Sequence, residues 1–435
     1  MSFVYRLITY AVSWFAYLGF MASYAQLGNG WLPWHFQRIY NAAEYLKLNG
    51  YFSSYGFTVW SKCQACGFNI EDWADEIYLS AHSIALSPYI ALNHFGGKEA
   101  LEFYGPAFDK LVIFIAAVAA SELIIKCVKN YFKIPVYFVG VSSFVLFATA
   151  PWTYKMLIAS WHEIYFLMFF LLGLLCFSNQ RNALACVLFV IAGFFDYQWG
   201  AAVSLFYFLI VFATSFTKES SVLKIYFPPS IVEMRHKLFM VCSLLAGTLF
   251  TLVLRFFAAQ DLKGAGGSSF LFRVGVAGDD IHNGGLLGAL QFLGGNRITV
   301  CFADYSSGNI SLNLLDGIAA YNCSLSIAGM AALSVLAVGG IFILLKKSEL
   351  STWVFVPLMF AFLVFITILQ QSLSVHLMGY SYVFSFIFAA GIISLMVYFS
   401  QFISSTALSL VFFVPCLIGI VLLSIRVSML TGING

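Results

Sequence analysis

The chain has little charge: only 9% of its 435 residues are Asp, Glu, Lys or Arg, whereas soluble domains average about 25%. Hydrophobic residues make up 61% and aromatic residues 18%. One soluble core cannot hide this much apolar surface, so the composition excludes a soluble globular protein. Apolar runs of about 20 residues, the length that crosses a bilayer, recur along the sequence. We therefore predict an all-α polytopic membrane protein that forms one integral membrane domain, residues 1–435.

Eleven apolar segments are predicted to be transmembrane helices. We expect the first to be retained, because it is too long for a signal-peptide core and no small-x-small cleavage site follows it. The fifth is short enough to share one hairpin with the sixth. The predicted spans are residues 5–26, 110–129, 134–151, 161–178, 183–195, 199–216, 238–257, 324–345, 351–371, 380–398 and 406–425.

Basic residues are concentrated in alternate connections between these spans. If the N-terminus is cytoplasmic, the cytoplasmic segments carry 11 basic and 3 acidic residues. The rest of the chain carries 11 basic and 16 acidic residues. This distribution follows the positive-inside rule. It places two long connections, residues 27–109 and 258–323, on the extracytoplasmic side, together with six of the seven histidines. We therefore expect any chemistry to face outward.

The first long connection opens with a polar segment, WHFQRIYNAAEYLKLNGYF at 34–52, directly after an apolar span. An apolar stripe at helical spacing predicts a helix that lies in the membrane interface, ending at Asn49-Gly50. The stripe consists of Phe36, Ile39, Ala43 and Leu46. Off the stripe lie His35, Arg38, Asn41 and Glu44. A second amphipathic stretch begins at Ser87-Pro88 and runs into the second span.

Later in the same connection four carboxylates stand within six residues. They are Glu71, Asp72, Asp75 and Glu76. Carboxylates this close repel one another unless they are solvated, paired or bound to a metal. Two interpretations stay open: a solvated acidic turn, or a catalytic or metal-binding role for Asp72, Asp75 or Glu76, with Mg²⁺ or Mn²⁺ as the cation. Cys63 and Cys66 form a nearby CxxC, which indicates a disulfide or free thiols more than zinc.

Two further polar groups interrupt apolar sequence. His162 and Glu163 stand where the fourth span begins, either as a helix cap or as a functional site. Asp196, Tyr197 and Gln198 break a 34-residue apolar run and predict a tight turn on the same outer side as Glu163.

Cationic and aromatic residues on the outer side are candidates for holding substrate. A planar guanidinium binds two phosphate oxygens at once. The candidates for a donor phosphate are Arg38, Lys155, Arg255, Arg273 and Arg297. The candidates for contacting donor or acceptor are Glu44, Glu76, His162, Asp196, His376 and Tyr380. No GxxxxGK[ST] phosphate loop occurs, and no nucleic-acid partner is expected.

This arrangement resembles the GT-C glycosyltransferases, integral membrane enzymes that use sugars linked to polyprenyl phosphates. The segment RIYNAAEYLKLNGYF is similar to the first-loop helix of oligosaccharyltransferase catalytic subunits and lipid A aminoarabinose transferases. The start of their second interfacial helix resembles SPYIALNHFGG in this chain. The acidic site before their fourth span resembles MLIASWHEIYFLMFF. The resemblance covers residues 1–217 and implies about 11 transmembrane helices with two interfacial helices in the first long loop.

The resemblance implies a transferase that moves a hexosyl or pentosyl group from a polyprenyl-phosphate donor to a hydroxyl of a glycan, lipid or protein. The expected location is a bacterial plasma membrane, with the active side extracytoplasmic and membrane lipids as further partners. In the relatives a catalytic aspartate precedes the segment that matches 38–50, and this chain has His35 there. The base is therefore expected to be His35, Asp72, Asp75 or Glu163.

Two other functions stay open on the sequence. A polysaccharide polymerase or O-antigen ligase would use Arg273, His282 and Arg297 in the second long connection. A transporter of lipid-linked sugars or small solutes would explain Glu122, Glu163 and Asp196 as intramembrane charges. Against a transporter stand the length of the first connection and the lack of an internal repeat.

Overall fold

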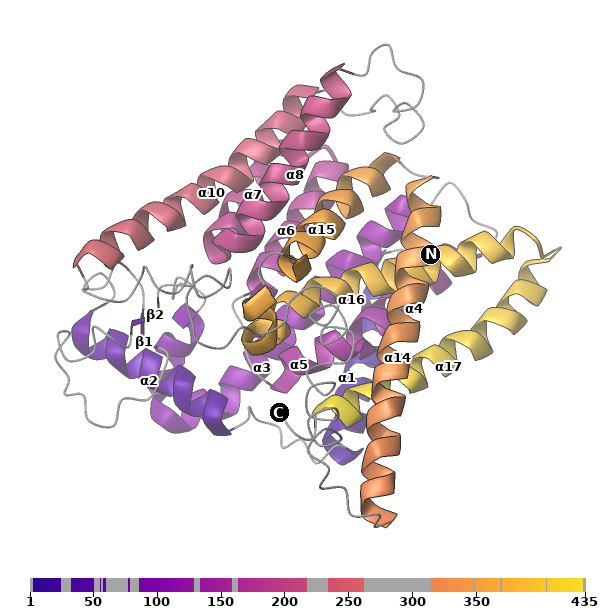
Figure 1. Cartoon of the computed structure of the whole chain (residues 1–435), viewed down its shortest axis with the longest axis horizontal. Coiled ribbons are helices and arrows are strands. Elements are labelled where there is room, and N and C mark those ends of the chain that lie inside the picture. The colour runs from indigo at the N-terminus through magenta and orange to yellow at the C-terminus, as the bar shows by residue number, and fades with distance from the viewer. Residues whose placement is uncertain are drawn as a thin grey trace.

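The computed structural model of the chain describes residues 3–24, 33–50, 55, 58–59, 77–78, 86–128, 134–158, 163–216, 234–261, 314–346, 349–367, 370–403 and 405–432. Almost all of these residues are helical (Figure 1). The helices are α1 (Phe3–Tyr24), α2 (Pro33–Asn49), α3 (Ser87–Val128), α4 (Val136–Thr149), α5 (Pro151–Ile158), α6 (Glu163–Ser178), α7 (Asn182–Phe195), α8 (Tyr197–Phe216), α10 (Met234–Asp261), α14 (Leu314–Leu345), α15 (Glu349–Thr367), α16 (Gln370–Ser400) and α17 (Thr406–Gly432). Within the described ranges, β-structure is confined to β1 (Thr58–Val59) and β2 (Ile77–Tyr78), which pair antiparallel.

Each predicted span overlaps one of these helices, and the prediction of a helical fold is confirmed. Among the described residues, four stretches are long and apolar enough to cross a bilayer: Ser87–Val128, Leu238–Ala258, Tyr382–Ser400 and Thr406–Val427. Several shorter apolar helices, such as Val136–Thr149, accompany them. The apolar helices therefore suit a membrane protein, while the number of eleven spans stays a prediction.

The start of α1 and the end of α3 meet at one end of the helical bundle, which we name the N-terminal end. The guanidinium of Arg6 donates to both carboxylate oxygens of Glu122, at 2.9 and 2.7 Å. Lys126 Nζ donates to Asn179 Oδ1 at 2.6 Å, which brings the turn after α6 to the same end.

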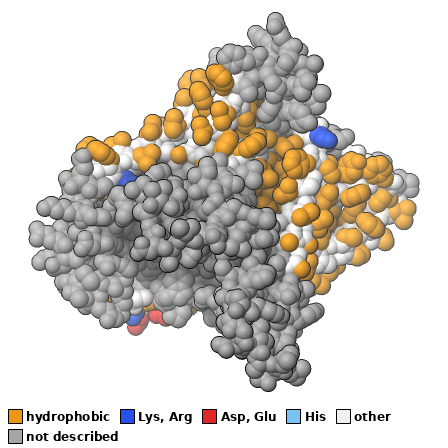
Figure 2. Space-filling model, in the orientation of Figure 1, with side chains coloured by type: hydrophobic (Ala, Val, Ile, Leu, Met, Phe, Trp, Pro, Cys, Tyr) orange, Lys and Arg blue, Asp and Glu red, His pale blue; other side chains and the backbone are white. Residues whose placement is uncertain are grey.

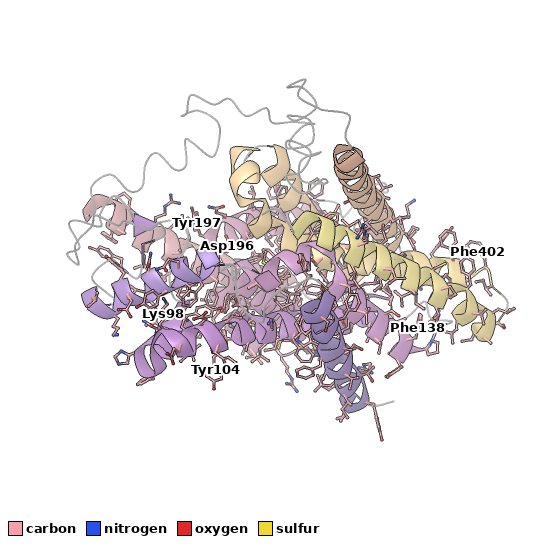
Figure 3. All side chains as sticks on the ribbon, turned by 90° about the horizontal axis from the view of Figure 1, so that it is seen from below. Lys98, Tyr104, Phe138, Asp196, Tyr197 and Phe402 are labelled. Carbon is pink, nitrogen blue, oxygen red and sulfur yellow. The ribbon has the colours of Figure 1, made fainter. Side chains whose placement is uncertain are left out.

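The other end, named the loop end, carries α2, the start of α3 and the turn between α7 and α8. Tyr89 of α3 and Tyr165 of α6 are joined there by a 2.8 Å hydrogen bond between their hydroxyls. Figure 3 shows Lys98, Asp196 and Tyr197 toward one side of the molecule, with Phe138 and Phe402 toward the other. Helices α3 and α6 therefore run from the loop end to the N-terminal end, and α7 runs back to the loop end.

Helix α2 occupies the predicted amphipathic segment. Pro33 takes its first position, where the missing N–H costs no hydrogen bond, and Gly50, with φ 82°, follows its last residue. The apolar stripe is buried, but it packs on protein: Ile39 lies in a small hydrophobic cluster with Tyr89 and Leu101 of α3. The stripe therefore attaches α2 to α3 instead of facing lipid.

The second amphipathic stretch and the second span form one element, α3, interrupted at Gly97. This residue has φ 70° and ψ −169°, a backbone conformation that residues with a Cβ rarely adopt. A Cβ there would meet open space, so backbone conformation alone favours glycine at this position. The break lets the start of α3 lie on α2 while its long apolar part enters the bundle (Figure 1).

Glycines permit close crossings between helices deeper in the bundle. A Cβ on Gly340 of α14 would collide with the carbonyl oxygen of Gly391 of α16, and one on Gly391 would collide with the carbonyl of Ala337. Small residues of this kind let helix backbones approach in a membrane, where van der Waals packing drives association. The crossing of α14 and α16 is therefore tight on both sides.

Candidate active site

The structure describes the predicted site residues to different extents. Outside the described residues lie Asp72, Asp75, Glu76, His162, Arg273 and Arg297, as well as Cys63, Cys66 and His282. The backbone is placed for His35 and Arg38 on α2, Lys155 on α5, Glu163 at the start of α6, and His376 and Tyr380 on α16. Side-chain contacts are described for Glu44, Asp196 and Arg255.

A buried carboxylate that the sequence analysis did not single out lies at the loop end. Asp109 of α3 is only 2% exposed, and Tyr89 Oη donates a hydrogen bond to its Oδ1. Tyr89 Oη is also 2.8 Å from Tyr165 Oη. Because the single proton of Tyr89 goes to Asp109, Tyr165 must donate to Tyr89. Three groups thus form a directed chain that ends on the carboxylate.

This chain connects the first long loop to the predicted acidic site. Tyr89 belongs to the part of α3 that packs on α2, and Tyr165 lies two residues after Glu163, the first residue of α6. The hydroxyl contact therefore holds the beginning of α6 against α3. The sequence signal was slight: Asp109 and Lys110 form a charged pair at the threshold of the second span.

Glu44 is partly exposed, and its carboxylate contacts α3. Its Oε1 accepts a hydrogen bond from Asn93 Nδ2 at 2.5 Å and lies 3.5 Å from Lys47 Nζ. Lys98 of α3 adds a second connection, with its Nζ 5.7 and 5.5 Å from the ring centroids of Phe36 and Tyr40. A polar and a cation–π contact therefore join α2 to the start of α3, and Glu44 has a clear structural role.

Asp196 occupies the predicted turn between two apolar helices and caps the second. It is 4% exposed, and its Oδ1 accepts hydrogen bonds from the backbone N–H groups of Gln198 (2.9 Å) and Trp199 (3.1 Å). A carboxylate at this position satisfies free N–H groups and is favoured by the helix dipole. The tight turn predicted at Asp196 is thus present, and the carboxylate orients the start of α8.

Arg255 near the end of α10 lies on this turn. Its Nη1 donates a hydrogen bond to Tyr197 Oη, and its guanidinium carbon is 5.2 Å from the centre of the Tyr197 ring. Gln198 Nε2 also reaches Tyr197 Oη, at 3.1 Å. A guanidinium held over an aromatic ring keeps a fixed orientation, which suits it to recognise a planar or tetrahedral anion.

Aromatic rings connect the two polar groups. Tyr165 stacks on Phe195, the residue before Asp196, with ring centroids 5.3 Å apart. The ring centroids of Trp199 and Tyr382 of α16 are 6.4 Å apart. This contact brings the helix that carries His376 and Tyr380 to the same end. The loop-end cluster is defined as Tyr89, Asp109, Tyr165, Asp196, Tyr197 and Arg255, and the stacking of Tyr165 on Phe195 joins its two parts. Asp196 and Tyr197 are labelled in Figure 3.

No metal site is formed by the part of the chain that the structure describes: it holds no group of three or more His, Cys, Asp and Glu side chains. The predicted ligands Asp72, Asp75 and Glu76 lie outside that part. In comparisons with protein-family models, curated proteins and solved structures, nothing matches the chain.

Proposed function

We propose that the chain is a membrane glycosyltransferase of the GT-C type, which moves a sugar from a polyprenyl-phosphate donor to an acceptor hydroxyl. The supporting observation is the loop-end cluster, in which the buried carboxylate of Asp109 and the guanidinium of Arg255 lie at one end of an apolar bundle. Ionisable groups among apolar helices are costly and mark functional sites by default. A polar region beside lipid suits a reaction between a greasy donor and a water-soluble acceptor.

Each part of the cluster has a role in the proposal. Arg255 holds the donor phosphate, and Tyr197 holds the guanidinium. The chain from Tyr165 to Asp109 positions the start of α6, where Glu163 stands. A base, either a carboxylate such as Glu163 or His35, takes the acceptor proton while the acceptor oxygen bonds to the anomeric carbon. The bond to the lipid phosphate breaks, and the phosphate leaves with the electron pair.

The proposal includes the eleven spans, a cytoplasmic N-terminus and an extracytoplasmic loop end in a bacterial plasma membrane. Basic residues at the N-terminal end, among them Arg6, Lys126 and Arg181, support this orientation through the positive-inside rule. Whether Mg²⁺ or Mn²⁺ takes part depends on Asp72, Asp75 and Glu76.

The transporter alternative loses two of its three intramembrane charges to structural roles. Glu122 is held by Arg6, and Asp196 caps α8. Neither carboxylate therefore needs a transported ion or solute to explain its position. The polymerase or ligase alternative depends on Arg273, His282 and Arg297.

The proposal is tested by donor turnover in lipid nanodiscs, with polyprenyl-phosphate sugars and a glycolipid extract as acceptor. We expect Arg255→Gln to lower turnover about 100-fold, the usual cost of removing one preorganised charge partner from a reacting group. The matched control is Arg426→Gln, because Arg426 is exposed on α17. Asp109→Asn should also lower kcat, whereas Glu102→Gln, an exposed carboxylate on the same helix, should not.

Two results would overturn the proposal. If the wild-type protein consumes no lipid-linked sugar, the transferase assignment is wrong, and movement of intact donor across liposomes would then identify a transporter. If turnover is present but insensitive to Arg255→Gln and Asp109→Asn, the loop-end cluster is not the active site. Loss of turnover with Arg273→Gln or His282→Gln would in that case identify the polymerase or ligase reaction.

A further inference from the structure

The hydroxyl of Tyr197, the first residue of α8, accepts two hydrogen bonds. Arg255 Nη1 donates one to Tyr197 Oη, and Gln198 Nε2 donates a second at 3.1 Å. A tyrosine hydroxyl has two acceptor positions and one proton. Because both acceptor positions are taken, the proton of Tyr197 must point away from Arg255 and from Gln198. Tyr197 can therefore engage a further group only as a donor.

In the part of the chain that the structure describes, no oxygen accepts this proton. The carboxylate of the preceding residue, Asp196, accepts from the backbone N–H groups of Gln198 and Trp199 instead. Tyr197 and Arg255 are both only partly buried, so a ligand can reach the hydroxyl. A hydroxyl beside a guanidinium suits an anion best, because hydrogen bonds to charged acceptors are the stronger ones.

The end of α10 indicates which anion reaches this hydroxyl. Exposed apolar side chains, such as Val253 and Phe256, continue along α10 as far as Phe257, four residues before the helix ends at Asp261. Figure 2 shows hydrophobic side chains along this side of the molecule. Arg255 therefore lies at the depth where the lipid-facing surface ends. The phosphates of membrane lipids occupy that depth, between the hydrocarbon and the water.

We propose that Tyr197 binds the lipid phosphate directly: its hydroxyl donates to one phosphate oxygen, while the guanidinium of Arg255 neutralises the charge. This role rests on the proposed function and adds to it a phosphate contact that does not act through Arg255. Gln198 is a positioning residue, because its amide and Arg255 together fix the direction of the Tyr197 proton. The site thus recognises the phosphate and not the polyprenyl chain.

Binding of the lipid product tests this contact without any turnover. The purified protein is titrated in detergent micelles with a short-chain polyprenyl phosphate and, in parallel, with the matching polyprenol, which lacks the phosphate. Tyr197→Phe keeps the ring under Arg255 but removes the hydroxyl. It should weaken binding of the phosphate about tenfold and leave polyprenol binding unchanged. The control Tyr398→Phe removes a hydroxyl beside Val128, at the N-terminal end, and should change neither.

A double-mutant cycle separates direct contact from support of the guanidinium. If Tyr197 donates to the phosphate, Tyr197→Phe should still weaken binding several-fold when Arg255→Gln is already present. An effect that disappears in that background would show that Tyr197 acts only through Arg255, and would overturn the proposal.

Other outcomes distinguish this contact from the transferase reaction. A wild-type protein that binds polyprenyl phosphate through Tyr197 but consumes no donor would reject the transferase and keep the phosphate site. Equal affinity for polyprenyl phosphate and polyprenol, or no effect of Tyr197→Phe, would overturn the proposal even if donor turnover is found. Displacement of polyprenyl phosphate by an equal concentration of inorganic phosphate would overturn it as well, because the ligand would then be a soluble phosphate.

Discussion

Buried carboxylates have different hydrogen-bond partners at the two ends of the bundle. At the N-terminal end, Arg6 and Glu122 neutralise each other through two hydrogen bonds, with both side chains 12% exposed, and Tyr10 Oη adds a third at 3.0 Å. At the loop end, Asp109 accepts from a tyrosine hydroxyl, and Asp196 accepts from backbone N–H groups. One end closes a charge pair, whereas at the other end a tyrosine hydroxyl and backbone N–H groups donate to the carboxylates.

This difference distinguishes charged groups that stabilise the fold from groups that can serve a reaction. A bidentate ion pair neutralises both charges and fixes both side chains in one geometry. A carboxylate that accepts hydrogen bonds from hydroxyl and N–H donors is fixed in place and can position neighbouring groups. The N-terminal end therefore stabilises the fold, and the loop end is where function is expected. Four measurements test this difference between the two ends.

The largest effect is expected from breaking the ion pair. Glu122→Leu leaves Arg6 without its partner inside the bundle and should lower the free energy of unfolding by about 3 kcal/mol. The double variant Arg6→Leu with Glu122→Leu should recover most of the loss, because no uncompensated charge remains. Reversible unfolding in mixed micelles measures both. The exposed pair at the loop end provides the control: Lys47→Ala should cost less than about 1 kcal/mol.

The next effect concerns the crossing of α14 and α16. Gly340→Ala places a methyl group against the backbone of Gly391 and should destabilise the protein by about 1–3 kcal/mol. Gly339→Ala is the matched control on the same helix, because a Cβ there meets open space. Equal melting temperatures for the two variants would show that the helices do not cross at Gly340.

A smaller effect is expected at the cap of α8. Asp196→Ala should cost about 1 kcal/mol, because the N–H groups of Gln198 and Trp199 lose their acceptor, while Asp196→Asn should preserve the cap. Thermal unfolding of both variants tests this. If Asp196→Asn keeps its stability but loses donor turnover, the carboxylate charge serves the reaction and not only the cap.

The smallest effect is expected between α2 and α3. Lys98→Met keeps the aliphatic stem but removes the cation over Phe36 and Tyr40, and should weaken their contact by about 0.5–1 kcal/mol. Limited proteolysis of the first long loop reports this locally, with the exposed Glu99→Gln as control. An unchanged cleavage rate would show that the apolar stripe alone holds α2.

Local patterns in the sequence predicted the elements well. The stripe and Asn49-Gly50 predicted α2, Ser87-Pro88 marked the start of α3, and Asp196 marked the turn between α7 and α8. Several helices are longer than their predicted spans; α14, for example, begins at Leu314 and α16 at Gln370. Hydropathy underestimates such helices because their polar first turns fall below the apolar signal.

The candidate site was predicted less completely than the helices. The turn at Asp196 was predicted from the sequence, and Arg255 was named as a candidate for the donor phosphate, but its contact with Tyr197 was not predicted. Asp109, Tyr89 and Tyr165 were not predicted, because a tyrosine near a predicted membrane interface is common and carries no sign of its partner. Glu44 was treated as a substrate-facing residue, yet its carboxylate is held by Asn93.

The sequence was sufficient to predict a membrane protein, the boundaries of α2 and of the turn between α7 and α8, and the connections that concentrate positive charge. These properties depend on composition and on neighbouring residues, so they are visible in a local pattern. The contacts between distant residues required the folded structure: Arg6 contacts Glu122, 116 residues away, Arg255 contacts Tyr197, 58 residues away, and Tyr89 donates to Asp109. Any of several residues could have met those groups, and the choice depends on how distant helices cross.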